Sequence, residues 1–193
     1  MKIEQFVMAY RAEQDRLRAM LPEGFISLRP VLRINAEIRS GQNVYLEFNT
    51  PVEGFGKRGW LNIAHWESPA TEISYEKNEK ATTFRTPFLE ITYTAVGIVG
   101  GCPAERDNDG CFFGENFVPS EKIDTNKEFC NCEFQWKFAE GNAHGINTDG
   151  KSIPAIPTEQ KTQYEKQELT PENAAAIPCE QVLGSYGVTF ERI

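Results

Sequence analysis

The sequence predicts a mainly β protein, built as one domain of many short antiparallel strands with two small helices. Apolar and polar residues alternate along several segments, turns containing Gly or Pro separate these segments, and only two short stretches have helical composition. The 193 residues suit one domain, residues 1–193, with a full core. Many short strands joined by such turns favour a barrel or a sandwich.

The first helix is predicted close to the start of the chain. Residues 12–20 are rich in helix formers, and Pro22 and Gly24 stop the helix. Residues 2–9, which precede it, fit either a strand or a loose helical turn.

Period-two alternation begins after this helix. In residues 30–39 the positions Leu32, Ile34, Ala36 and Ile38 are apolar and the positions between them are polar, which predicts a half-buried strand. The next expected elements are a turn at 40–43, a hairpin partner at 44–50, a Gly-rich loop at 54–59 and a strand at 60–66.

The second half of the chain is also predominantly β in character. Residues 67–80 are expected to form an exposed excursion or short hairpin. Residues 82–99 form a β-prone run, and Pro87 makes its centre either a bend or a sheet edge. Residues 129–138 alternate most regularly, and their expected partner is the segment 151–164 across a turn at 147–150. A helix with Thr170 as N-cap and a strand at 185–193 complete the prediction.

Composition excludes several classes of function. Twenty basic against 28 acidic residues give a net charge of −8, which disfavours nucleic acid and anionic membranes as partners. No apolar run approaches the ~18 residues of a membrane span, and the polar start has no signal-peptide core, so a cytoplasmic location is expected.

The cysteines and histidines do not predict a metal site or a bound cofactor. The odd count of five cysteines favours reduced thiols, and Cys130 and Cys132 are expected to be buried core thiols. Residues 105–110 resemble half of a calcium loop, but Asn116 stands where the loop would end in Glu.

A short helix, the stop Leu21-Pro22-Glu23-Gly24 and the alternating strand after it resemble the start of the acetoacetate decarboxylase-like superfamily. The aromatic and Gly-rich stretch 45–66 is compatible with that resemblance. It implies a closed antiparallel β-barrel with an enclosed pocket, in a homo-oligomer. Decarboxylases of the family use a lysine that forms a Schiff base with a β-keto acid. That lysine sits in a Lys-Lys motif that this sequence lacks, so it is not carried over.

The candidate site residues are the polar groups on otherwise apolar strands and the nearest available amine. The expected catalytic residues are Lys57, Glu47 and Glu90, and the expected substrate-binding residues are Arg33, Arg85 and His65. An arginine would pair with a substrate carboxylate and a glutamate would act as acid or base. The same side chains would simply be solvated if their sheet face were wet, and the sequence leaves this open.

Three functions compete. The leading hypothesis is a pocket protein that binds or transforms a small organic acid, with lyase chemistry if it is an enzyme. The second is a non-catalytic binding module with the same barrel. The third is an interaction protein in which aromatic residues such as Trp60 cover an oligomer contact.

Overall fold

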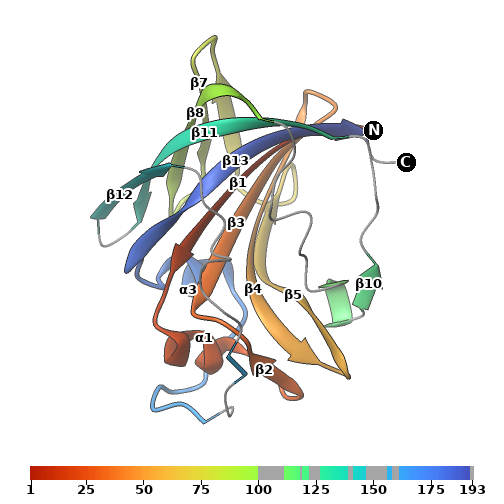
Figure 1. Cartoon of the computed structure of the whole chain (residues 1–193), viewed down its shortest axis with the longest axis vertical. Coiled ribbons are helices and arrows are strands. Elements are labelled where there is room, and N and C mark those ends of the chain that lie inside the picture. The colour runs from red at the N-terminus through yellow and green to blue at the C-terminus, as the bar shows by residue number, and fades with distance from the viewer. Residues whose placement is uncertain are drawn as a thin grey trace.

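The computed structural model describes residues 1–99, 111–117, 119–121, 127–138, 141–146, 156–157 and 161–191. Within this part, thirteen strands form one sheet (Figure 1). The strands are β1 (Lys2–Arg11), β2 (Phe25–Ser27), β3 (Val31–Arg39), β4 (Asn43–Gly54), β5 (Lys57–Glu67), β6 (Ser74–Lys77), β7 (Ala81–Arg85), β8 (Glu90–Val99), β9 (Cys111–Phe113), β10 (Pro119–Glu121), β11 (Lys127–Phe138), β12 (Gly141–Ile146) and β13 (Gln181–Glu191). The helices are α1 (Gln14–Met20), α3 (Pro171–Ala175) and the 3-10 turn η1 (Glu115–Phe117).

The sheet is open. Its strands follow the order β10-β9-β5-β4-β3-β1-β13-β11-β8-β7-β6, with β12 beside β11 and β2 beside β4. Within the described residues no pairing joins the end strands β10 and β6, so the predicted closed barrel is not present. Figure 1 shows the central strands twisting and curving, with α1, α3 and β2 gathered at one end of the sheet.

Most of the predicted elements in the first hundred residues are confirmed. Residues 2–9 belong to the strand β1, and the alternating segment forms β3, which pairs with β4 in the predicted hairpin. The Gly-rich loop is a tight connection in which Gly56 has φ of +72°, a value that favours glycine. The predicted bend at Pro87 separates β7 from β8.

Two predictions about pairing are wrong. The strand β11 pairs with β8, β13 and β12, and β12 is the segment 141–146 rather than 151–164. One pair is also not antiparallel, because β9 runs parallel to residues 59–61 of β5. Both differences arise from pairings between distant segments, which alternation within one strand does not encode.

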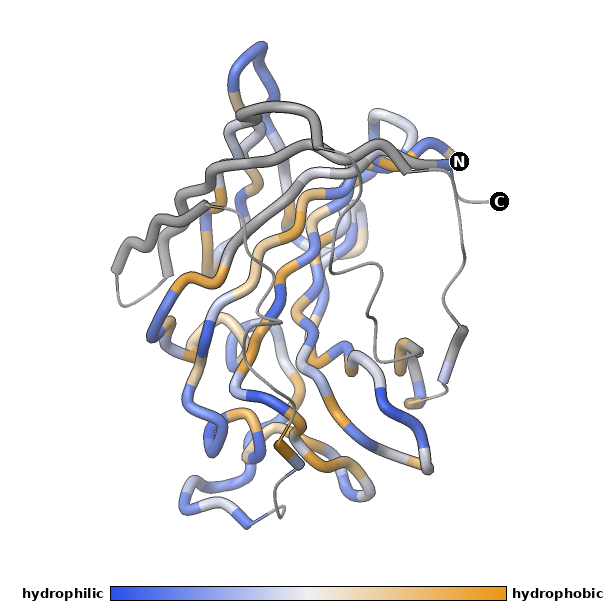
Figure 2. The backbone as a smooth tube through the Cα atoms, in the orientation of Figure 1, coloured by the Kyte–Doolittle hydropathy of each residue, from blue (hydrophilic) through white to orange (hydrophobic). Residues whose placement is uncertain are grey.

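The predicted half-buried character of β3 is also wrong. Eight of its nine residues are buried, and these include Arg33, Asn35 and Glu37. One face of β3 joins the main hydrophobic core through Leu32, Ile34, Ala36 and Ile38. The opposite face is polar and is covered as well. Figure 2 shows the resulting alternation of hydrophobic and hydrophilic residues along the central strands.

Both helices pack on the apolar face. Leu17 and Met20 of α1, and Ala174 of α3, belong to the same core cluster as Phe48 of β4. The predicted N-cap of α3 is confirmed, because the Thr170 hydroxyl accepts a hydrogen bond from the backbone N–H of Asn173. These helices therefore cover the apolar side of the sheet at one end.

In the part of the chain that the structure describes, no helix is long and apolar enough to cross a membrane, and no three potential metal ligands lie together. Cys179 is a free, half-buried thiol, and burial raises its pKa to about 11. The side chains of Cys130 and Cys132, and the whole segment 105–110, lie outside the described residues.

Candidate functional site

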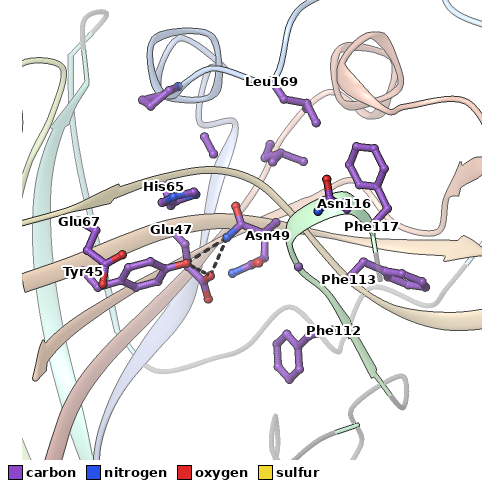
Figure 3. A pocket seen from close by; sticks show the side chains of 15 residues that line it. Tyr45, Glu47, Asn49, His65, Glu67, Phe112, Phe113, Asn116, Phe117 and Leu169 are labelled. Atoms are coloured by element: carbon purple, nitrogen blue, oxygen red, sulfur yellow. Dashed lines mark hydrogen bonds between the residues drawn. The ribbon is translucent and has the colours of Figure 1, made fainter. Parts of the chain in front are cut away.

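A pocket lies along the edge of β5. The short strand β9 pairs only with residues 59–61, so residues 62–67 of β5 have no neighbouring strand on that side in the described sheet. A cavity of about 400 Å³ occupies this position. It is lined by Tyr45, Glu47, Asn49, Asn62, Ile63, Ala64, His65, Glu67, Phe112, Phe113, Gly114, Asn116, Phe117, Leu169 and Pro171 (Figure 3). The polar lining comes mainly from β4 and β5, and the aromatic lining from β9 and η1.

Glu47 is the most heavily hydrogen-bonded carboxylate in the pocket wall. Its Oε2 accepts from the Tyr45 hydroxyl at 2.7 Å and from Asn62 Nδ2 at 2.9 Å, as Figure 3 shows. Its Oε1 accepts from Asn35 Nδ2 at 2.8 Å. Burial and the neighbouring Glu47 carboxylate raise the pKa of Tyr45. The phenol therefore stays protonated and acts as a donor to Glu47.

A second group of charges is internally paired. Arg39 Nε lies 2.8 Å from Glu37, and its Nη1 lies 2.6 Å from Glu67. Gln5 also donates to Glu37, and the Arg39 guanidinium lies 3.9 Å from the centre of the Tyr45 ring. The positive charge of Arg39 is thus neutralised within the protein.

Arg33 differs from Arg39 because no carboxylate lies within salt-bridge distance of it in the described structure. The side chain is on β3, the residue is 5% exposed, and its Nε has no hydrogen-bond partner. The guanidinium lies 4.0 Å from the centre of the Trp60 ring and 5.6 Å from that of Phe112. Stacking supports the cation, but it does not satisfy the N–H donors.

Three more buried polar atoms near Arg33 lack a hydrogen-bond partner. They are Asn49 Nδ2, Trp60 Nε1 and Asn35 Oδ1. Asn49 lies directly opposite Arg33 in the β3–β4 ladder and also lines the pocket. Each such atom costs about 1–3 kcal/mol when it is buried without a partner. Several of them in one place indicate a site that is completed by something other than the protein.

The structure brings three of the six predicted residues to this region. Glu47 and His65 line the pocket, where His65 stacks on Tyr45 with ring centres 5.8 Å apart. Arg33 lies beside the pocket, because Phe112 contacts its guanidinium and also lines the cavity.

The other three predicted residues do not line this pocket. Lys57 is exposed at the start of β5, where the β4–β5 hairpin turns. Arg85 and Glu90 are a cross-strand pair of β7 and β8, joined at 2.8 Å between Nε and Oε2. The hydrogen bond from Arg85 to Glu90 raises the pKa of the guanidinium.

Several residues of the region were not predicted. Asn35 and Asn49 lie on the same sheet face as Arg33 and Glu47, and Tyr45 precedes Glu47 by two positions. The signal was present in the alternation, because residues 45, 47 and 49 are all polar and share one face of a strand. Trp60 was considered only as an oligomer contact.

The comparisons with known proteins concern the fold. No family model matches the chain, and no curated protein matches it. Solved structures do match. The enduracididine biosynthesis enzyme MppR complexed with pyruvate is 14% identical with a TM-score of 0.54, and the match covers 98% of this chain and 86% of that one.

Two further structures match over nearly the whole chain. Acetoacetate decarboxylase from Legionella pneumophila is 12% identical with a TM-score of 0.54, and the match covers 98% of this chain and 82% of that one. An acetoacetate decarboxylase-like enzyme from Sphingomonas wittichii RW1 is 9% identical with a TM-score of 0.53. The match covers 98% of this chain and 89% of that one. The resemblance found in the sequence is thereby confirmed for the fold alone: the chain is similar in fold to MppR and to these two acetoacetate decarboxylase-type structures.

Proposed function

We propose that this protein binds a small organic acid at the pocket beside β5, with the carboxylate of the acid on Arg33. The supporting observation is the buried guanidinium with an unused Nε donor and no carboxylate within salt-bridge distance in the described structure. A buried charge is retained when it is paired, and a ligand carboxylate would supply the missing partner. Asn49 Nδ2 and Trp60 Nε1 would add two further donors.

The size of the cavity agrees with a small ligand. The cavity of about 400 Å³ is at the lower end of the usual range for ligand pockets. Aromatic rings from β9 and η1 enclose one side of it, including Phe113 and Phe117. Keto acids are the first ligands to test, since one structure of the same fold, MppR, holds pyruvate.

Lyase-type chemistry is the reaction class that we propose for this pocket. Glu47, the predicted acid or base, lines the pocket and could accept or release a proton there. His65, predicted as a substrate-binding residue, lines the pocket as well. Lys57 remains the predicted amine for a Schiff base. The predicted roles of Glu90 and Arg85 remain proposals at their positions on β7 and β8.

A non-catalytic binding module is the second candidate, and the surroundings of Glu47 favour it. Three protein donors already bond to this carboxylate. To take a proton from a substrate, Glu47 would have to give up one of these hydrogen bonds. Such an arrangement is typical of a residue that fixes the positions of its neighbours.

The first experiment measures binding of pyruvate and acetoacetate by calorimetry to the wild type and to Arg33→Met. Loss of a charge-assisted hydrogen bond predicts at least tenfold weaker binding to the variant. Arg58→Met is the matched control, because Arg58 is an exposed arginine of β5 that pairs with Glu53 at the hairpin. The Arg58→Met variant should bind both acids with the affinity of the wild type. Equal affinities for the wild type and Arg33→Met, or no binding by the wild type, would contradict the proposal.

A second measurement separates the two candidate functions. Carbon dioxide release and borohydride trapping are followed with the same two acids, and the adducts are located by peptide mass spectrometry. Turnover or a lysine adduct identifies an enzyme, and an adduct on Lys57 would identify the predicted nucleophile. Saturable binding with neither signal identifies a binding module for these acids.

A further inference from the structure

We propose that the acid carries a hydroxyl group one or two carbons from its carboxylate, and that this hydroxyl donates a hydrogen bond to Asn35 Oδ1. The inference rests on the proposed function, because it needs a carboxylate on Arg33. The hydroxyl contact is a second point of recognition, in addition to the carboxylate on Arg33. Hydroxy acids would therefore bind better than the corresponding keto acids.

The hydrogen-bond network fixes the orientation of the Asn35 amide. Its Nδ2 donates to Glu47 Oε1 at 2.8 Å, and the reverse orientation would place two oxygens against each other. The Glu47 carboxylate only accepts hydrogen bonds, and its other oxygen already accepts from Tyr45 and Asn62. Asn35 Oδ1 is thus an acceptor, and it is buried without a hydrogen-bond partner in a residue that is 3% exposed.

This acceptor lies next to the proposed carboxylate site. Asn35 follows Arg33 by two residues on one face of β3, a separation of roughly 6–7 Å along the strand. Across the ladder, Asn49 lies opposite Arg33 and Glu47 lies opposite Asn35. Three unused donors, on Arg33, Asn49 and Trp60, and one unused acceptor therefore share a small region. A carboxylate with a nearby hydroxyl matches both kinds of atom.

The same atoms disfavour the two nearest alternatives. A keto oxygen is only an acceptor, so it would leave Asn35 Oδ1 unsatisfied and would meet it with a partial charge of the same sign. An ammonium group has three donors. Of the four unpartnered atoms in this region, which include Arg33 Nε, only Asn35 Oδ1 is an acceptor. A hydroxyl donates once and can turn to do so.

A series of ligands tests the inference on the unmodified protein. Binding is measured for lactate, pyruvate, alanine and propionate, and then for 3-hydroxybutyrate, acetoacetate and butyrate. Of lactate and 3-hydroxybutyrate, the acid that binds tighter should bind about tenfold tighter than its deoxy analogue, propionate or butyrate. This is the effect of one net hydrogen bond. The keto counterpart of that hydroxy acid should bind no tighter than the deoxy acid. A keto acid or alanine that binds tighter than both hydroxy acids would overturn the inference.

A variant locates the effect. Asn35→Leu removes the acceptor with little change in volume, and the ratio of hydroxy-acid to deoxy-acid affinity should fall from about ten to about one. Affinity for the deoxy acid then reports whether the variant still folds and retains the carboxylate site. Asn43→Leu, at an exposed position of β4, is the control and should keep the full ratio. An unchanged ratio in Asn35→Leu would overturn the assignment to Asn35.

The outcomes distinguish this inference from the proposed function. If all the acids bind equally and Arg33→Met weakens them equally, the carboxylate site stands and the hydroxyl contact is wrong. If none of the acids binds, the proposed function itself is wrong. If Asn35→Leu does not fold, the ligand series on the wild type still decides the preference.

Discussion

The two faces of β3 and β4 are both buried, but they are buried in different ways. On one face Ile34, Ala36 and Phe48 pack into the main core beneath α1 and α3. On the other face Arg33 and Asn35 are equally inaccessible, although they are polar and keep atoms without hydrogen-bond partners. Burial alone therefore does not distinguish the faces, whereas the completeness of hydrogen bonding does.

The difference indicates what each face contributes. Burying apolar side chains is favourable by itself, at roughly 25 cal/mol per Å² of apolar surface. Burying polar atoms without partners is unfavourable, so the unpartnered atoms of the polar face reduce the stability of the free protein. A protein keeps such a face where the missing partners arrive with a ligand. Substitutions of Phe48 on the apolar face and of Arg33 on the polar face should therefore separate stability from binding.

The largest expected effect is on the apolar face. Phe48 is fully buried in the core, and Phe48→Ala should lower the free energy of unfolding by about 3–5 kcal/mol. Chemical denaturation measures this change. The variant tests the comparison most directly, because a loss below about 1 kcal/mol would show that the face is loosely packed.

Arg33→Met is the counterpart of Phe48→Ala on the polar face. It removes a buried charge and keeps an unbranched side chain beside Trp60, so the free energy of unfolding should change by less than about 1.5 kcal/mol. Binding should be lost while stability is retained. Loss of stability comparable to that of Phe48→Ala would show that the two faces play the same role.

Glu47→Gln should have an intermediate effect. The substitution replaces one acceptor oxygen by an NH₂ donor that would face the donors of Tyr45, Asn35 or Asn62. One unsatisfied buried donor predicts a loss of about 1–3 kcal/mol in the free energy of unfolding. Thermal and chemical denaturation at pH 7 measure it. A variant as stable as the wild type would show that the three hydrogen bonds contribute nothing net.

The smallest expected effect concerns α1, which covers the apolar face. Asp15 accepts a hydrogen bond from the backbone N–H of Gln163 and pairs with Arg18, and these contacts lower its pKa below the ordinary 3.8. Because the pKa is lower in the folded state, the stabilisation is present above about pH 4. It disappears as the pH falls through the folded-state pKa.

Asp15→Asn measures this contribution. Unfolding midpoints of the variant and the wild type should differ slightly at pH 7 and converge as the pH falls below 3.8. Binding of organic acids at pH 7 should not change, because Asp15 is not on the polar face. Unfolding midpoints that differ more at pH 3 than at pH 7 would contradict the expectation that ionised Asp15 stabilises the folded protein.

The fold could be predicted from the sequence where the signals are local. Alternation in residues 30–39 correctly separated Ile34 from Arg33, and Thr170 correctly marked a helix start. The burial of the Arg33 face could not be predicted, because Phe112 and Leu183 reach it from distant segments. The partner of β11 was wrong for the same reason. The closed barrel was predicted from the many short strands and from the resemblance, and neither shows whether the two end strands of the sheet pair.

The site was predicted in part for a related reason. Glu47 and Arg33 attracted notice as charges on apolar strands, whereas Asn35 and Asn49 on the same face did not. A neutral amide is common in turns and at exposed positions, so its type gives little signal. What distinguishes these asparagines is an atom without a partner, and only the three-dimensional arrangement reveals that.

The position of β13 has a consequence for how the chain folds. β13 lies between β1 and β11, and Lys2 of β1 pairs with Glu191 of β13. During synthesis β1 and β3 can associate early, but the other edge of β1 stays unpaired until β13 leaves the ribosome. Contacts between such distant segments slow folding and leave a strand edge open to other chains. Nascent chains of this protein are therefore expected to need shielding of that edge until β13 has left the ribosome.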